Sequence, residues 1–367
     1  MFKIISEKNK NREYSIVLSA SQTDGMVLRD SLGIDIKFEE DSIKAYKIVR
    51  IGDYVAHLRS FQGGFAFSDK IGVCSPAYTI LRPSELISYG FLKPYFMSQK
   101  FINSLRIVTY GIRDGKSISI EEWMKLCTII PRTDEQVKIS IFLKLIDERI
   151  ATQNKIIERY ESLIRGIMVE LQKQGLKKGT WKKVFLNNIL TERNERNSNL
   201  YQVFSVSVSQ GIINQVDHLG RSFSAKDTSK YNVVHYGDLV YTKSPTGSFP
   251  YGIVKQSLNR ESVAVSPLYG VYVPNSLAIG VYLHKYFMSE INTHNYLHPL
   301  IQKGAKNTIN ITNQRFLENR VPIPLDSNEL LLISKLLRSV NDKIRHEQNM
   351  LQEYQNQKQY LLRQMFI

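Results

Sequence analysis

The sequence contains one pattern written twice, and this repeat constrains the fold more than any other feature. The stretch YKIVRIGDYV at 46–55 returns as YNVVHYGDLV at 231–240, 185 residues later. YFMS occurs at 95–98 and again at 286–289, 191 residues later. Further matches keep the same order, with displacements between 185 and 193: LSASQ (18–22) with VSVSQ (206–210), SPAY (75–78) with SPLY (266–269), and Gly111, Ile118, Trp123 and Pro131 with Gly304, Ile311, Phe316 and Pro324. Two copies at so long a period indicate a pair of domains, because solenoids use many short repeats.

Each copy ends in a segment with the spacing of a long coiled-coil helix. Apolar residues recur there at alternating steps of four and three, which places them on one seam. The residues that we assign to helix–helix packing are Ile139, Leu143, Ile146, Ile150, Ile157 and Tyr160 in the first copy, and Ile333, Leu337, Val340, Ile344, Leu351 and Tyr354 in the second. A polar residue, Gln153 or Glu347, interrupts both seams at the same step. The alternative, a helix packed only on its own domain, is disfavoured because the first seam has ten positions over 33 residues.

The linker between the copies predicts how these helices meet. Nine residues, QKQGLKKGT, separate Leu171 from Trp181. These nine residues span at most about 30 Å, whereas the 33-residue helix that precedes them is about 50 Å long. The second domain must therefore begin near the end of the first helix, so the helices run antiparallel. We expect an α+β chain in which two tandem mixed α/β domains are separated by a long antiparallel two-helix coiled coil, as a dumb-bell with approximate two-fold symmetry. The predicted divisions are 1–131 and 175–324 for the globular domains, and 132–174 and 325–367 for the helices.

Composition limits the kind of partner and the compartment. Lysine and arginine number 49 against 34 acidic residues, a net charge of +15, which favours nucleic acid first and an acidic membrane surface second. The two cysteines, Cys74 and Cys127, form no disulfide framework, which fits a reducing cytoplasm. No stretch approaches 18 apolar residues and the first residues lack an apolar signal region, so we expect no membrane span and no secretory signal.

Motifs for bond chemistry are missing from the sequence. GxxxxGK[ST], HExxH, CxxC and a Gly-rich turn between strand and helix do not occur. His294 and His298 have a metal-like spacing, but Pro299 follows directly and no third ligand is near in sequence, which favours packing. We therefore predict no catalytic, cofactor-binding or metal-binding residues.

The loops after the repeated Gly-Asp turn carry the residue types of a DNA reader. HLRSFQGGFAFS (57–68) and YTKSPTGSFPYG (241–252) are rich in serine, glycine and aromatic residues, and each has one cation. Arginine can bind guanine O6 and N7, glutamine can bind adenine N6 and N7, and serine and lysine suit phosphate oxygens. Ser-Gln pairs and a cation after Gly111 and Gly304 offer similar chemistry elsewhere. The candidate DNA-binding residues are Ser21, Gln22, Arg59, Ser60, Gln62, Arg113, Ser209, Gln210, Lys243, Ser244 and Lys306.

Two alternatives stay open at this point. Solvated loops that only fix a turn contain the same residue types, although equivalent placement in both copies favours binding. The basic linker either touches DNA or keeps the hinge soluble; its lysines are Lys173, Lys177, Lys178, Lys182 and Lys183.

Together, these segments resemble the DNA-specificity subunit of type I restriction–modification systems over essentially the whole chain. The motifs that carry the resemblance are LRSFQGG (58–64), GVCSPAYTIL (72–81), IIPRTDEQVKISIFLKLIDERI (129–150), VPIP (321–324) and NDKIRHEQNMLQEYQNQKQYLLRQMF (341–366). There are two departures. Residues matching Trp181 to about Asn188 would lie before Met1, which predicts a missing or trimmed strand or helix. The second helix also opens with SNE (327–329) where the first has DEQ (134–136).

The resemblance implies a non-catalytic, DNA-binding function. Each globular unit would be a target-recognition domain that reads one half of a bipartite, asymmetric site in double-stranded DNA. The helices would set the spacer and dock two methyltransferase subunits, which bind S-adenosylmethionine, and a motor-nuclease subunit would complete the complex. A coiled-coil structural adaptor without base-specific recognition is the alternative.

Overall fold

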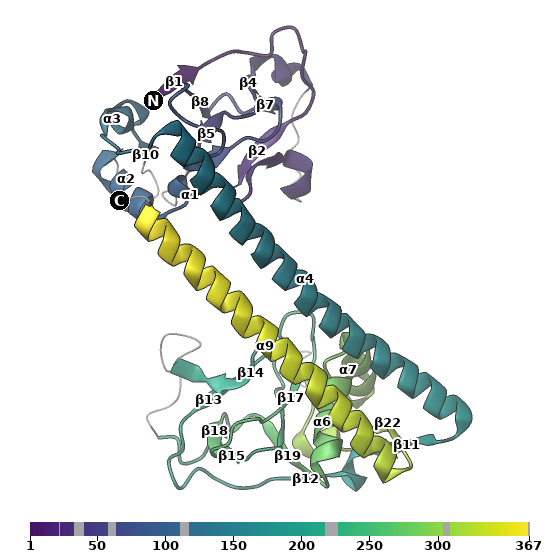
Figure 1. Cartoon of the computed structure of the whole chain (residues 1–367). Coiled ribbons are helices and arrows are strands. Elements are labelled where there is room, and N and C mark those ends of the chain that lie inside the picture. The colour runs from purple at the N-terminus through teal and green to yellow at the C-terminus, as the bar shows by residue number, and fades with distance from the viewer. Residues whose placement is uncertain are drawn as a thin grey trace. The chain divides into compact units, whose positions relative to one another are not determined.

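The structure, a computed structural model, consists of two compact units, each of which contains one end of each long helix (Figure 1). Unit 1 comprises Met1–Asn154 and Asn349–Ile367, and unit 2 comprises Lys155–Gln348. The described residues are 1–21, 23–32, 40–57, 64–110, 117–216, 227–303 and 309–365.

Unit 1 combines short antiparallel strands with short helices. Its strands are β1 (Phe2–Ile5), β2 (Leu18–Ser21), β3 (Gly25–Leu28), β4 (Lys47–Val49), β5 (Tyr54–Ala56), β6 (Phe65–Phe67), β7 (Gly72–Cys74), β8 (Thr79–Pro83), β9 (Thr109–Tyr110) and β10 (Ser117–Ile118). Its helices are α1 (Leu92–Phe96), α2 (Gln99–Leu105), α3 (Ile120–Lys125) and the start of α4 (Thr133–Lys178), with 3₁₀ turns η1 (Arg29–Leu32), η2 (Glu40–Ala45) and η3 (Arg106–Val108).

Unit 2 uses the same kinds of element. Its strands are β11 (Trp181–Phe185), β12 (Leu190–Glu192), β13 (Phe204–Ser207), β14 (Gly211–Asn214), β15 (Asn232–Val234), β16 (Leu239–Tyr241), β17 (Val254–Gln256), β18 (Val263–Val265), β19 (Gly270–Pro274), β20 (Gln302–Lys303), β21 (Ile309–Asn310) and β22 (Arg320–Pro324). Its helices are α6 (Leu277–Tyr286), α7 (Glu290–Leu297), α8 (Asn313–Phe316) and the start of α9 (Ser327–Met365), with η5 (Leu186–Asn188) and η6 (His298–Leu300).

Strand pairing repeats from one unit to the other. The four-stranded sheet has the order β1-β8-β5-β6 in unit 1 and β12-β19-β16-β17 in unit 2. The pairs β2–β3, β4–β7 and β9–β10 likewise have counterparts in β13–β14, β15–β18 and β20–β21. Within the described residues, the pair β11–β22 has no counterpart in unit 1. The internal repeat of the sequence is thus a repeat of the fold.

Repeated polar residues fix the helix starts in both units. Ser98 and Ser289, the last residues of the two YFMS motifs, accept the backbone N–H of Phe101 and Asn292 and thereby cap α2 and α7. Such a cap satisfies an N–H that the first turn of a helix leaves unpaired. The repeat of YFMS therefore reflects a shared helix start.

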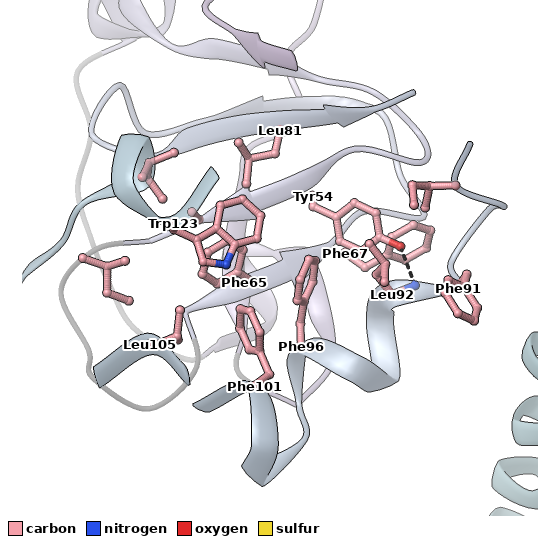
Figure 2. Close-up of a cluster of buried hydrophobic side chains, with 14 of the residues drawn as sticks. Tyr54, Phe65, Phe67, Leu81, Phe91, Leu92, Phe96, Phe101, Leu105 and Trp123 are labelled. Atoms are coloured by element: carbon pink, nitrogen blue, oxygen red, sulfur yellow. Dashed lines mark hydrogen bonds between the residues drawn. The ribbon is translucent and has the colours of Figure 1, made fainter. Parts of the chain in front are cut away.

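The core of unit 1 is a cluster of aromatic side chains (Figure 2). Phe65 and Trp123 have ring centroids 4.7 Å apart, and so have Phe96 and Phe101. Phe316, the counterpart of Trp123 in the repeat, is fully buried in unit 2, where Tyr241 and Tyr272 stack on it at 4.6 and 4.8 Å. One aromatic side chain from the end of each copy thus lies in each core.

The two long helices are antiparallel within each unit. In unit 1, Lys358 of α9 pairs with Asp147 of α4, and Arg149 lies over the ring of Tyr354 at 5.1 Å. Residue numbers therefore rise along α4 in the direction in which they fall along α9. In unit 2, Trp181 follows the end of α4 and donates its indole N–H to Glu329, near the start of α9, at 2.7 Å.

Burial follows the apolar seam along both helices. Every assigned packing residue is buried or half-buried, and so are Gln153 and Glu347. Helix residues off the seam, such as Leu336 and Leu145, have exposed side chains. The structure has the predicted α+β class with long antiparallel helices, while the predicted domain divisions and the dumb-bell arrangement stay predictions.

The first helix extends further than its seam. α4 continues to Lys178, so most of the predicted linker is helical. Leu176, Lys177 and Lys178 are good helix formers, and Gly179 ends the helix with a positive φ of 73°.

Candidate nucleic-acid interface

The base of the candidate DNA loops is a buried carboxylate held by an arginine. Gly52 and Gly237 turn the chain with φ of 92° and 91°, and the aspartate that follows each glycine is buried. Asp53 accepts two hydrogen bonds from Arg82, at 2.8 and 2.9 Å. Asp238 accepts two from Arg193, at 2.8 and 3.1 Å. These bidentate pairs fix the start of β5 and of β16.

The arginines of these pairs come from different strands. Arg82 lies on β8, whereas Arg193 follows β12, the counterpart of β1. Hydrogen bonds to Asp53 raise the pKa of Arg82. Burial lowers the pKa of Arg193, but the bonds to Asp238 outweigh it and the net direction is upward. The repeated Gly-Asp turn therefore predicts the carboxylate but not the residue that neutralises it.

The loop after β16, which carries Lys243, is closed by a hydrogen bond at its base. Thr242 N–H donates to the Ile253 carbonyl at 2.9 Å, which closes the loop at its base. Gly252 is required there, since a Cβ would lie 1.7 Å from the Thr242 carbonyl oxygen. Lys243 is half-buried and Ser244 exposed. Burial lowers the pKa of Lys243, while the Glu192 carboxylate opposes this effect. The loop thus presents a partly desolvated cation beside an exposed hydroxyl.

The second pair of predicted loops consists of the hairpin tips β2–β3 and β13–β14. Ser21 is the last residue of β2 and pairs with Gly25, whereas its structural counterpart, Ser207, pairs with Gly211. Ser209 therefore lies two residues further on, within the turn, although the sequence repeat matches it to Ser21. The two Ser-Gln pairs match in sequence but are not structurally equivalent, because strand register sets which residues correspond.

The two hairpin tips differ in charge. In unit 1, Asp24 accepts hydrogen bonds from Thr23 and Ser21, at 2.7 and 3.0 Å, and these bonds lower its pKa. In unit 2, the tip holds Ser209 and Gln210, and the Gln210 N–H donates to Ser207 Oγ at 3.4 Å. A carboxylate can accept from cytosine N4, whereas an amide suits adenine. The tips are therefore chemically suited to different bases.

Six of the predicted residues lie outside the described part of the chain. They are Gln22, Arg59, Ser60, Gln62, Arg113 and Lys306. The described candidates, Ser21, Ser209, Gln210, Lys243 and Ser244, lie on the hairpin tips and the loop after β16, and their role in binding stays a prediction.

Sequence reasoning missed a polar cluster beside Asp238. The ring of His235 contacts Ser262 Oγ through Nδ1 at 2.8 Å and Glu195 through Nε2 at 2.7 Å. Although this resembles a catalytic triad, Glu7 and Arg50 pair at the same place in unit 1, at 2.9 Å. Because arginine cannot act as a general base there, the shared feature is a contact between a basic side chain and a glutamate beside the turn. The sequence signal for this cluster is that His235 replaces Arg50 at the matching position of the repeated stretch.

Two buried lysines were also missed. Lys255 on β17 and Lys285 on α6 are each only 6% exposed, and burial lowers the pKa of each to about 8. Lys285 donates to Asn341 at 2.6 Å. The counterpart of Lys255 in β6 is Ala66, so unit 2 buries an amine where unit 1 has a methyl group.

Other classes of site find little support in the described residues. Within them, no three His, Cys, Asp or Glu side chains come together as metal ligands would. His294 and His298 stack on each other at 5.2 Å and lie against Tyr251. None of the helices in the described ranges is both long and apolar enough for a membrane crossing.

Comparison with known proteins identifies the fold. No family model matches the sequence, and no curated protein matches it. The S subunit of a type I restriction–modification system from M. genitalium aligns with a TM-score of 0.57 at 11% identity, covering 100% of this chain and 94% of that one. A chain from work on complex assembly and conformational transition of the type I system aligns with a TM-score of 0.50 at 14% identity, covering 100% and 97%. The chain therefore has the fold of a type I S subunit along its whole length.

Proposed function

We propose that the chain is the DNA-specificity subunit of a type I restriction–modification complex. Each unit reads one half of a bipartite, asymmetric site, and double-stranded DNA is the ligand of the loops. The chain carries no catalytic residues of its own and takes its place in the complex by binding two methyltransferase subunits and a motor-nuclease subunit.

One observation carries this proposal: two units of the same topology, joined by antiparallel helices, share a fold with a type I S subunit over the entire chain. The hairpin tips of the units differ in charge, which supports an asymmetric site. The net charge of +15 supports a polyanionic ligand.

The test is DNA binding by the chain together with its methyltransferase subunits. Affinity should fall steeply with salt, because several cations displace counterions from the phosphates. Charge reversal in both loops, Arg59→Glu with Lys243→Glu, should abolish sequence-specific binding. The control reverses one exposed lysine per copy outside these loops, Lys3→Glu with Lys230→Glu, and should retain the preference for one site. Salt-independent binding would contradict the proposal.

The helices are proposed to set the distance between the two half-sites. Insertion of one heptad in each helix lengthens the pair by about 10 Å, or about three base pairs. The preferred spacer should lengthen accordingly, as measured by selecting DNA sites from a random pool. An unchanged spacer would refute this role of the helices.

A structural adaptor is the second candidate, favoured only by the continuous helical seam. It would keep its partners after charge reversal of Arg59 and Lys243, and it would show no preference among DNA sequences. Titration with S-adenosylmethionine separates both candidates from a modifying enzyme, because we expect no binding to the chain without its methyltransferase partners.

A further inference from the structure

One face of helix α7 lies along the loop after β16. Glu290, His294 and His298 follow one another at steps of four residues, so their side chains lie on the same side of the helix, which we call the contact face. Glu290 Oε1 accepts a hydrogen bond from the hydroxyl of Ser248, in the loop. The ring centroids of His294 and His298 lie 5.3 and 6.0 Å from that of Tyr251, in the same loop. All three side chains of the contact face therefore meet the loop.

Other residues of α7 fix the helix in the core of unit 2. Thr293, Tyr296 and Leu297 are all buried. Thr293 Oγ1 donates to the Phe287 carbonyl at 2.7 Å, and the side-chain amide of Asn319 donates to the Tyr296 carbonyl at 2.7 Å. Since close-packed interiors move little, the contact face is a fixed support for the loop.

The tip of the loop is a tight turn that is tied to this support. Thr246 and Phe249 exchange two backbone hydrogen bonds of 3.0 Å and thereby enclose Gly247 and Ser248. Gly247 has a positive φ of 55°. Phe249 is buried, whereas the two enclosed residues are exposed. The bond from Ser248 to Glu290 therefore joins an exposed turn to a helix that is anchored in the core.

The contact face differs between the units although the helix start is shared. Ser98 and Ser289 cap α2 and α7 in the same way. The positions of unit 1 that match the contact face hold Gln99, Asn103 and Ile107. The loop after β16 likewise differs in sequence from the matching loop of unit 1. Helix formation alone does not explain this joint difference, whereas a contact face adapted to its own loop does.

We propose that the contact face of α7 positions the loop after β16 for the readout of DNA bases. Glu290 is a positioning residue that fixes the turn through Ser248, and the two histidines fix Tyr251 near the base of the loop. This inference rests on the proposed function, in which the loop reads DNA. A loop that is held in place before binding does not lose affinity to its own ordering. Glu290 acts through Ser248 and not on DNA itself, because a carboxylate is repelled by phosphates.

A double-mutant cycle tests this role in the chain bound to its methyltransferase subunits. The measured quantity is the ratio of the affinities for the preferred DNA site and for sites in which one half is scrambled. Ser248→Ala and Glu290→Ala should each lower this ratio about tenfold for one half-site, and leave it unchanged for the half that unit 1 reads. The double variant should lose no more than either single variant, because both changes break the same contact. Glu290→Gln keeps an acceptor without the charge and should keep the ratio. Asn295→Ala, at an exposed position of α7 off the contact face, is the control.

Two further measurements examine the support itself. Hydrogen exchange of the full chain without DNA reports on the N–H groups of Thr246 and Phe249, which are bonded across the turn. Ser248→Ala and Glu290→Ala should speed this exchange about tenfold, and Glu290→Gln should not. Replacement of both histidines by alanine should lower the affinity ratio about threefold, and replacement of both by phenylalanine, which keeps the ring contacts, should restore it.

Three results would overturn the proposal. Equal losses of the ratio in Glu290→Gln and Glu290→Ala would make the carboxylate a DNA contact. Unchanged exchange in both alanine variants would mean that the hydrogen bond does not hold the turn, and faster exchange with an unchanged ratio would mean that the held turn has no part in readout. If the unchanged chain preferred no DNA site, the proposed function would fail and this inference with it; the exchange measurement, which needs no DNA, distinguishes that failure from the lack of a support.

Discussion

Lys255 should destabilise unit 2 at neutral pH, and its replacement by methionine should show by how much. The side chain lies on β17 opposite Val240, beside a cluster of valine side chains. Its electrostatic neighbours, His284 and Lys285, are basic. Burial lowers its pKa from 10.5 to about 8. At about 1.4 kcal/mol per pKa unit, the buried charge costs at most about 3.5 kcal/mol.

The sign of the pH dependence follows from the two pKa values. Below pH 8 both the folded and the unfolded chain hold the proton, so the cost is fully present. Between pH 8 and 10.5 the folded chain has released the proton and the unfolded chain has not, so the free energy of unfolding rises with pH. Above 10.5 neither state is charged. Lys255→Met should therefore stabilise unit 2 by up to about 3.5 kcal/mol at pH 7, and this gain should shrink towards pH 10.

The assay uses the one tryptophan of unit 2. The chain has only two tryptophans, so a Trp123→Phe background leaves Trp181 as the reporter, and phenylalanine already occupies the matching core position in unit 2. Urea unfolding is followed by fluorescence at pH 7, 8.5 and about 10. Lys335→Met, at an exposed position of α9, is the control and should change stability equally at each pH. A gain that does not depend on pH, or a loss at pH 7, would refute the reasoning.

Three further predictions use the same urea assay. Asp238→Asn should lower the stability of unit 2 by about 3 kcal/mol, because it leaves a partly buried arginine without its carboxylate. Gly252→Ala should lower the free energy of unfolding by more than about 2 kcal/mol, because the added Cβ would lie 1.7 Å from the Thr242 carbonyl oxygen. Gly247→Ala adds a Cβ with no atom within 4 Å and should cost about 1 kcal/mol. Equal losses would contradict the steric clash at Gly252. Leu337→Ala, in the buried seam, should cost about 2–5 kcal/mol, whereas its neighbour Leu336→Ala, which is 46% exposed, should change stability by less than about 0.5 kcal/mol; similar losses would place the seam elsewhere.

The sequence predicted those features that depend on local periodicity. Apolar residues spaced alternately by four and three, beginning at Ile139 and Leu143, mark one face of a helix. Burial follows this spacing along both long helices. The short linker predicted antiparallel helices because chain length limits distance. The YFMS repeat marked the two copies, but only the structure shows that its serine begins a helix in each of them.

Features that depend on strand register could not be predicted. Ser21 and Ser209 match in letters but differ in position within their hairpins, since only the pairing with Gly25 or Gly211 defines the turn. Arg82 and Arg193 lie in different strands but bind equivalent carboxylates, and their spacing from those aspartates in the sequence does not predict the pairs. Lys255 gives no signal of burial, because a lysine within a strand is ordinarily on the solvent face.

The exchanged arginines restrict which hybrids of the two units can fold. Ile5 stands in unit 1 where unit 2 has Arg193, and Val273 stands in unit 2 where unit 1 has Arg82. A recombinant that joined the first strand of unit 1 to the later strands of unit 2 would inherit the interior carboxylate and no counter-ion for it. The reciprocal recombinant would inherit two guanidinium groups for one acid. Viable crossovers between such genes must therefore fall outside the span from the first strand to the end of the sheet.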